Sequence, residues 1–135
     1  MQFNSARRTV PGIVARPDET KEYWFHEGCH ILEISNRDDD PEASIARARV
    51  APGVTTHWHS LRGVTERYLI LKGRGEVEVG ESGIQIMEAG DIILIPSGTR
   101  QRIRNCGNDD LIFYAICTPR FTSACYQDIS EPDSG

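Results

Sequence analysis

Short segments of alternating hydrophobic and polar residues recur along the chain from residue 29 to about residue 117. In 44–50, for example, Arg47 and Arg49 share one parity while Ala48 and Val50 share the other. Successive side chains of a β-strand point to opposite faces, so this alternation predicts strands. The predicted strands are 29–35, 44–50, 66–72, 76–79, 84–86, 92–95, 102–104 and 111–116, with a further strand beginning near Tyr23.

Turn residues separate these segments at nearly even spacing, and no long amphipathic helix interrupts them. Glycines recur from Gly73 to Gly107, and an acidic run ends at Pro41. Short strands with such turns are typical of an antiparallel sandwich or barrel, so the predicted fold class is all-β. The segments 66–72 and 111–116 are apolar on both faces, so we expect the N-terminal arm, the C-terminal segment or a second subunit to cover the outer face.

The length favours one domain. A chain of 135 residues divided into two cores would leave each half near the lower limit for independent stability. Residues 1–22 lack a period and are predicted to be an N-terminal arm; residues 23–127 form the barrel, and 128–135 form an acidic tail. The segment 118–126, which carries two aromatic residues, is expected to pack across the sheet or a partner subunit.

Composition excludes several classes of protein. The chain has 15 Lys and Arg against 20 Asp and Glu, a net charge of −5, so it has no excess of cations for nucleic acid. Mean hydropathy is −0.42, and no apolar run approaches the ~20 residues of a membrane span. The first residues lack the apolar stretch of a secretory signal. The sequence therefore predicts a cytoplasmic protein without nucleic acid or membrane partners.

The cysteines and two of the histidines are predicted to be structural. Cys29, Cys106, Cys117 and Cys125 form no CxxC pair, and a free cysteine is commonly a small core residue. His26 and His30 lie outside any recognisable ligand spacing, so we expect them to be ordinary polar residues.

His57 and His59 lie two residues apart, which on a strand places both imidazoles on one face. Glu66 begins the next apolar segment after a loop that contains Gly63, and an antiparallel neighbour can bring its carboxylate beside that pair. Two imidazoles and a carboxylate make a set suited to a divalent first-row metal with open coordination positions. The spacing therefore predicts a metal site.

With the segment from Gly90 to Asn105, the chain resembles the cupin superfamily. The first cupin motif, G(X)5HXH(X)3–4E(X)6G, is matched by His57, His59, Glu66 and Gly73, although six residues separate His59 from Glu66 and Gly53 lies closer to His57 than in the pattern. The second motif, G(X)5PXG(X)2H(X)3N, is matched at its glycine, proline and asparagine positions. Gln101 stands where the family has its third histidine.

This resemblance implies a double-stranded β-helix, or jelly roll, with a metal held in the barrel mouth by His57, His59, Glu66 and Gln101. The metal would be a divalent first-row ion: Fe, Mn, Ni, Co or Zn. A glutamine amide is a weaker donor than imidazole, so Gln101 is expected to be a weak ligand or to bond to one. Small cupins are commonly dimers, which agrees with the homodimer expected from the two-faced strands.

Five further residues are candidates for the pocket wall. Thr55, Tyr68 and Ile70 share the predicted inward parity of the ligands, although Ile70 could equally belong to the core. Arg47 and Arg49 share one face of their strand; if that face is internal, either could bind a substrate carboxylate through two hydrogen bonds. If it is external, they are solvated edge charges.

These features predict a metal-binding cupin, an enzyme of the dioxygenase, isomerase or lyase type acting on a small polar organic molecule such as a sugar or oxo acid. The alternative is a non-catalytic cupin that binds a small ligand as a sensor or storage module. The sequence identifies no catalytic residue, and turnover is the property that separates the two hypotheses.

Overall fold

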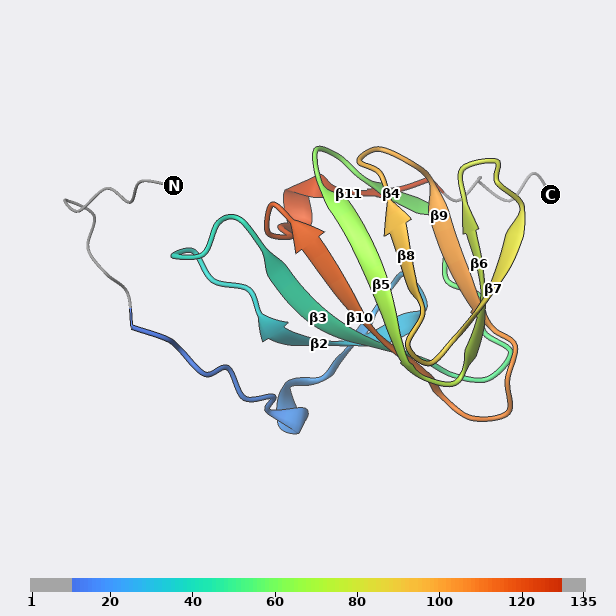
Figure 1. Cartoon of the computed structure of the whole chain (residues 1–135), viewed down its shortest axis with the longest axis horizontal. Coiled ribbons are helices and arrows are strands. Elements are labelled where there is room, and N and C mark those ends of the chain that lie inside the picture. Colours follow the sequence, from blue (N-terminus) through green and yellow to red (C-terminus); the bar gives the residue numbers. More distant parts are fainter. Residues whose placement is uncertain (1–10, 130–135) are drawn as a thin grey trace.

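Two antiparallel β-sheets face each other and enclose the hydrophobic core (Figure 1). The computed structural model describes residues 11–129. The sheets have the strand orders β1-β2-β3-β10-β5-β8 and β11-β4-β9-β6-β7. The strands are β1 (Tyr23–Phe25), β2 (Cys29–Ser35), β3 (Ser44–Val50), β4 (His59–Leu61), β5 (Thr65–Lys72), β6 (Arg74–Val79), β7 (Ile84–Glu88), β8 (Ile92–Ile95), β9 (Gln101–Asn105), β10 (Leu111–Thr118) and β11 (Tyr126–Asp128). The predicted all-β, double-stranded β-helix architecture is confirmed.

In the part of the chain that the structure describes, the remaining regular structure consists of two helical turns, η1 (Glu19–Lys21) and η2 (Ser123–Cys125). Neither of these turns, nor any other helical segment within 11–129, is long and apolar enough to cross a membrane.

Strand β10 lies at the centre of the larger sheet, where it pairs with β3 on one side and β5 on the other. Phe113, for example, lies opposite Ala48 and Ile70, and all three side chains are buried. The inward residues of these strands join those of β6 and β9 in one core, because alternation sends every second side chain to the same side.

The outer face of the edge strand β8 is apolar. Ile92 and Leu94 are 65% and 58% exposed, while Ile95 is buried in the core. These side chains leave an apolar surface on β8. The expected dimer rests on the apolar pattern of the segments 66–72 and 111–116, and it stays a prediction.

Two residues of the cupin-like motifs shape the end of the barrel away from β4. Gly73 has φ +91°, and a Cβ there would lie 2.9 Å from the carbonyl oxygen of Asp110. The side chain of Asn105 donates to the carbonyl oxygens of Val50 and Asp109 at 2.9 and 2.7 Å. Both residues therefore serve the fold: Gly73 allows a close approach of backbones, and Asn105 holds the loop that follows β9.

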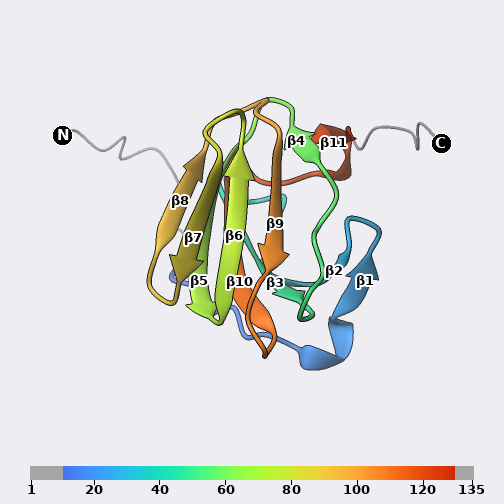
Figure 2. The same cartoon turned by 90° about the vertical axis from the view of Figure 1, so that its right-hand side faces the viewer.

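The C-terminal segment packs on the barrel, as predicted, because β11 pairs with β4 and extends the smaller sheet. In Figure 2, β4 and β11 lie on the same side of the barrel as β1 and β2, away from β7 and β8. Side chains from the edges of both sheets therefore gather on this side. The domain limits stay predictions, and parts of the predicted arm and tail, 1–10 and 130–135, lie outside the described residues.

Candidate ligand-binding site

His59 begins strand β4, faces Gln101 across the strand pair, and has a side chain only 3% exposed. Its Nδ1 lies 2.8 Å from the carbonyl oxygen of His57. Since a carbonyl only accepts, Nδ1 carries the hydrogen, and Nε2 of the neutral ring keeps its lone pair. Burial lowers the pKa of His59, which favours this neutral form.

His57 does not join His59. Its side chain is 49% exposed, and its Nδ1 lies 3.8 Å from Oδ2 of Asp128. The expectation that the two imidazoles share a face is wrong because it required a continuous strand, whereas β4 begins only at His59. The backbone N–H of His57 instead donates to the carbonyl oxygen of Glu27 at 2.8 Å.

Glu66, on β5, is buried as expected for a residue of the site. Its Oε2 accepts from the thiol of Cys117 at 3.7 Å, and its Oε1 has no hydrogen-bond partner. Burial raises the pKa of Glu66 to about 7; the nearby His59 opposes this rise and Glu27 adds to it. An unpaired carboxyl oxygen at this depth is a group able to bind a ligand.

Gln101 is fully buried on β9, together with Ile103, so the predicted inward parity of these two residues is confirmed. The phenol of Tyr68 donates to Oε1 of Gln101, and the amide Nε2 has no hydrogen-bond partner. Tyr68 therefore fixes the orientation of the amide. The Gln101 side chain also lowers the pKa of Glu66, so the amide lies near that carboxyl group, although neither Nε2 of Gln101 nor Oε1 of Glu66 completes a hydrogen bond.

Glu27, in the turn between β1 and β2, is a site residue that the sequence did not reveal. It is buried, and its Oε1 lies 3.4 Å from Nε2 of His59. Burial and the charge of Asp128 raise the pKa of Glu27 to about 8. A turn residue has no parity that predicts its direction; the one signal was a carboxylate beside Gly28 in an otherwise apolar region.

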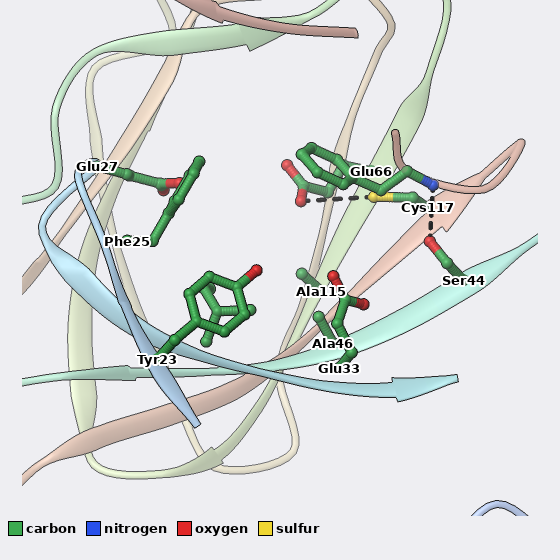
Figure 3. A pocket seen from close by; sticks show the side chains of 11 residues that line it. Tyr23, Phe25, Glu27, Glu33, Ser44, Ala46, Glu66, Ala115 and Cys117 are labelled. Atoms are coloured by element: carbon green, nitrogen blue, oxygen red, sulfur yellow. Dashed lines mark hydrogen bonds between the residues drawn. The ribbon is translucent and has the colours of Figure 1, made fainter. Parts of the chain in front are cut away.

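A cavity of about 60 Å³ opens beside Glu66. Carboxyl groups, aromatic rings and small side chains line it (Figure 3). The lining residues are Tyr23, Phe25, Glu27, Ile31, Glu33, Ser44, Ala46, Glu66, Ala115, Cys117 and Phe121. Strands β1, β2, β3, β5 and β10 thus all contribute to its wall.

None of the five predicted pocket candidates lines this cavity. Ile70 belongs to the core and Tyr68 bonds to Gln101. Thr55 is exposed, and its neighbour Thr56 turns inward, where its hydroxyl accepts from the N–H of Ile103 at 3.0 Å. The physical reason is the break in alternation before β4, which shifts the inward parity by one residue.

Arg47 and Arg49 lie on the outer face of β3, so the external alternative is the correct one. Arg47 forms two hydrogen bonds with Glu19, at 2.7 and 2.6 Å, and Arg49 lies 2.5 Å from Glu22. These contacts hold the segment before β1 against the sheet. Neither guanidinium is placed to bind a substrate carboxylate in the cavity.

The donors expected for a metal are therefore only partly assembled. His59, Glu66 and Gln101 offer one imidazole, one carboxylate and one amide around a buried space, but His57 points away. Within residues 11–129, no three His, Cys, Asp or Glu side chains are grouped so that they could hold a metal ion. As arranged, the side chains do not fit the divalent metal that the resemblance implies.

Two facing antiparallel sheets with a polar site between their edges define a small double-stranded β-helix barrel. Residues 46–117 match the family Cupin_2, described as a cupin domain. The chain belongs to this family, which confirms the resemblance noted in its motifs.

The chain is also similar to individual proteins and to solved structures. The chain is 37% identical over 71 residues to an oxalate-binding protein of Thermotoga maritima, covering 53% of this chain and 58% of that one. It is 30% identical over 116 residues to an uncharacterized protein of Methanocaldococcus jannaschii, covering 84% and 92%. Among solved structures, KdgF from Halomonas sp. superposes with a TM-score of 0.72 at 16% identity, covering 84% and 99%. This last similarity concerns the fold alone.

Proposed function

We propose that this cupin holds a small polar organic molecule in the cavity beside Glu66. The observation that carries the proposal is the carboxyl group of Glu66, which lines a partly open cavity and has one buried oxygen without a hydrogen-bond partner. A bound molecule that donates to Oε1 would satisfy this oxygen, because a buried polar atom without a partner is costly. The relative named as an oxalate-binding protein supports a small ligand as the class of partner.

We further propose that the chain is an enzyme of the isomerase or lyase type. Both reactions move a proton on the substrate, and a carboxyl group at the cavity wall can accept or donate that proton. Glu66 is positioned for this role, and its pKa, raised to about 7 by burial, keeps both protonation states accessible near neutral pH. Among the described residues that line the cavity, Glu66 alone has a buried carboxyl oxygen without a hydrogen-bond partner.

The metalloenzyme form of this proposal, which includes dioxygenation, requires a rearrangement. His57 would have to turn inward to complete a set with His59, Glu66 and Gln101. Elemental analysis after gentle purification, repeated after incubation with Fe(II) or Mn(II), tests this form. A stoichiometric ion that is lost in both His57→Ala and His59→Ala supports it, and an ion retained in His57→Ala contradicts the predicted ligand set.

Turnover separates the enzyme from a non-catalytic sensor or storage module. Small molecules released from the denatured protein are identified by mass spectrometry, and a panel of related sugars, oxo acids and amines is screened for conversion. Glu66→Gln should abolish conversion while the fold persists, and Glu81→Gln, an exposed change of the same charge, should leave it intact. A ligand that binds stoichiometrically without conversion would support the non-catalytic alternative.

A further inference from the structure

The cavity wall carries acidic groups and no basic ones. Glu27, Glu33 and Glu66 all line it, and none of the other described lining residues is Lys, Arg or His. A cation placed in this space of about 60 Å³ would stabilise the ionised forms of the three carboxyl groups, an attraction that low-dielectric walls strengthen. An anion placed there would find no basic side chain among the described lining residues.

The three carboxyl groups come from different elements and surround the space rather than meeting at a point. Glu27 follows β1, Glu33 lies on β2 and Glu66 lies on β5. Figure 3 shows Glu27 and Glu33 at separate edges of the cavity, with Glu66 apart from both. Since no three acidic, His or Cys side chains in the described chain are grouped to hold a metal ion, this spread suits a charged group of several atoms better than a single ion.

Aromatic and aliphatic side chains form the remaining wall. Tyr23, Phe25 and Phe121 contribute rings, and Ile31 and Ala115 contribute apolar surface. The face of an aromatic ring attracts an organic cation, and the apolar surface accepts its carbon atoms. Carboxylates combined with aromatic rings are the chemistry that recognises an amine or a methylated ammonium group.

Two arginines near the cavity are bonded to other partners, and Arg120 only partly offsets the charge of Glu33. Ala46 lines the cavity from β3, and its neighbour Arg47 lies on the opposite face, bonded to Glu19. Arg120 acts on Glu33 from outside the wall, where its guanidinium bonds to Asn36 at 2.8 Å and lies 3.4 Å from Asp38. These cations are occupied by other partners and are not directed into the space.

We propose that the cavity binds the ammonium group of a small organic cation, with Glu27, Glu33 and Glu66 around the charge and the aromatic rings against its carbon atoms. This inference rests on the proposed function, because it specifies the ligand of the same cavity. It also separates this chain from a binder of dicarboxylates: oxalate, the ligand named for one relative, would meet three carboxyl groups here.

A series of small probes that differ in charge tests the inference. Ethylammonium, 1-propanol and propionate are titrated into the purified full chain at one fixed pH, and binding is followed by calorimetry and by chemical shifts of the lining residues. Ethylammonium should bind at least tenfold more tightly than 1-propanol, and propionate should not perturb the lining residues. Two variants test which carboxyl groups attract the cation: Glu66→Gln changes a buried lining residue, and Glu33→Gln changes an exposed residue at the cavity mouth. Because Glu33 is exposed, the Glu33→Gln variant should fold normally.

Both variants should weaken ethylammonium binding, Glu66→Gln by about tenfold and Glu33→Gln by about threefold, the range expected for one charge-assisted contact. Binding of 1-propanol should change less than that of ethylammonium in both variants, and Glu81→Gln should leave all three probes unaffected. Equal binding of the three probes, or an ethylammonium affinity that both variants leave unchanged, overturns the inference and leaves the ligand cavity standing. If no probe of any charge perturbs the lining residues, the proposed function fails with it.

Discussion

The ring of Tyr126 stacks on the imidazole of His59, with centroids 5.3 Å apart and planes inclined by 19°. Tyr126 begins β11, so the last strand of the described chain covers the candidate site directly. Phe25 also meets Tyr126, edge to face at 5.1 Å, and joins this cover to strand β1. The two ends of the barrel sequence thus close over one histidine.

Removing this ring should destabilise the protein, whereas removing its hydroxyl should not. The hydroxyl of Tyr126 is buried without a hydrogen-bond partner, so Tyr126→Phe should change the free energy of unfolding by no more than about 0.5 kcal/mol or increase it. Tyr126→Ala should cost roughly 2–4 kcal/mol through lost packing. Urea denaturation measures both variants, and a larger loss for Phe than for Ala would contradict the packing argument.

Gly73→Ala should be much more damaging than Gly83→Ala. Both glycines have positive φ, +91° and +81°, but a Cβ at Gly73 would lie 2.9 Å from the carbonyl oxygen of Asp110, and one at Gly83 meets nothing within 4 Å. Backbone strain alone costs about 1–2 kcal/mol, and the clash should add roughly as much again at Gly73. Thermal unfolding of the pair provides the measurement; equal losses would show that the close approach relaxes freely.

Asn105→Ala should destabilise the barrel by roughly 2–3 kcal/mol without altering the candidate site. The substitution leaves the carbonyl of Val50 and the N–H of Gly107 without their side-chain partner. Denaturation measures the loss, and the chemical shifts of the cavity residues serve as the control. Large shift changes around Glu66 would indicate that Asn105 acts on the site as well as on the loop.

Stability should fall in acid partly because of Glu22. Its hydrogen bond to Arg49, followed by that to Arg47, lowers the pKa of Glu22 from 4.5 to about 2. A carboxyl whose folded pKa is depressed stabilises the fold above its unfolded pKa, and this contribution disappears as the pH falls from about 5 toward 2. After allowance for solvent screening we expect about 1–2 kcal/mol from this group.

The variant Glu22→Gln should therefore be less stable than the wild type at pH 6 and equally stable near pH 2. Glu42→Gln, an exposed change of the same charge, should keep the wild-type acid dependence. Unfolding free energies measured across the range provide the comparison. An unchanged acid slope in Glu22→Gln would assign the acid sensitivity to other carboxyl groups.

The strands and the fold could be predicted because continuous alternation states which side chains enter the core. Gln101 and Ile103 were placed correctly by this argument, since β9 is regular through both residues. Strands β4 and β11 have three residues each, too few for a period, and their pairing depends on tertiary contacts. The sequence therefore predicted the barrel better than its edge.

The site was predicted less well for the same reason. His57 and Thr55 were placed by extending a period of two into a segment that is not a strand, and Glu27 lies in a turn, where no period exists. Glu66 is buried as predicted because β5 holds it in a regular register opposite Cys117 on β10, but β5 and β4 lie in different sheets, so the two strands are not the antiparallel neighbours that the sequence suggested. Parity is informative only as far as the hydrogen-bonded ladder continues.

The irregular stretch between Thr56 and His59 interrupts the alternation of inward and outward side chains. The inward positions before and after it are three residues apart. The two histidines therefore occupy different environments, although they look equivalent in the printed sequence: His57 is half-exposed and His59 is buried. The HXH pattern thus gives only the order of the two imidazoles along the chain. The conformation of the backbone between them determines which imidazole lies inside the barrel.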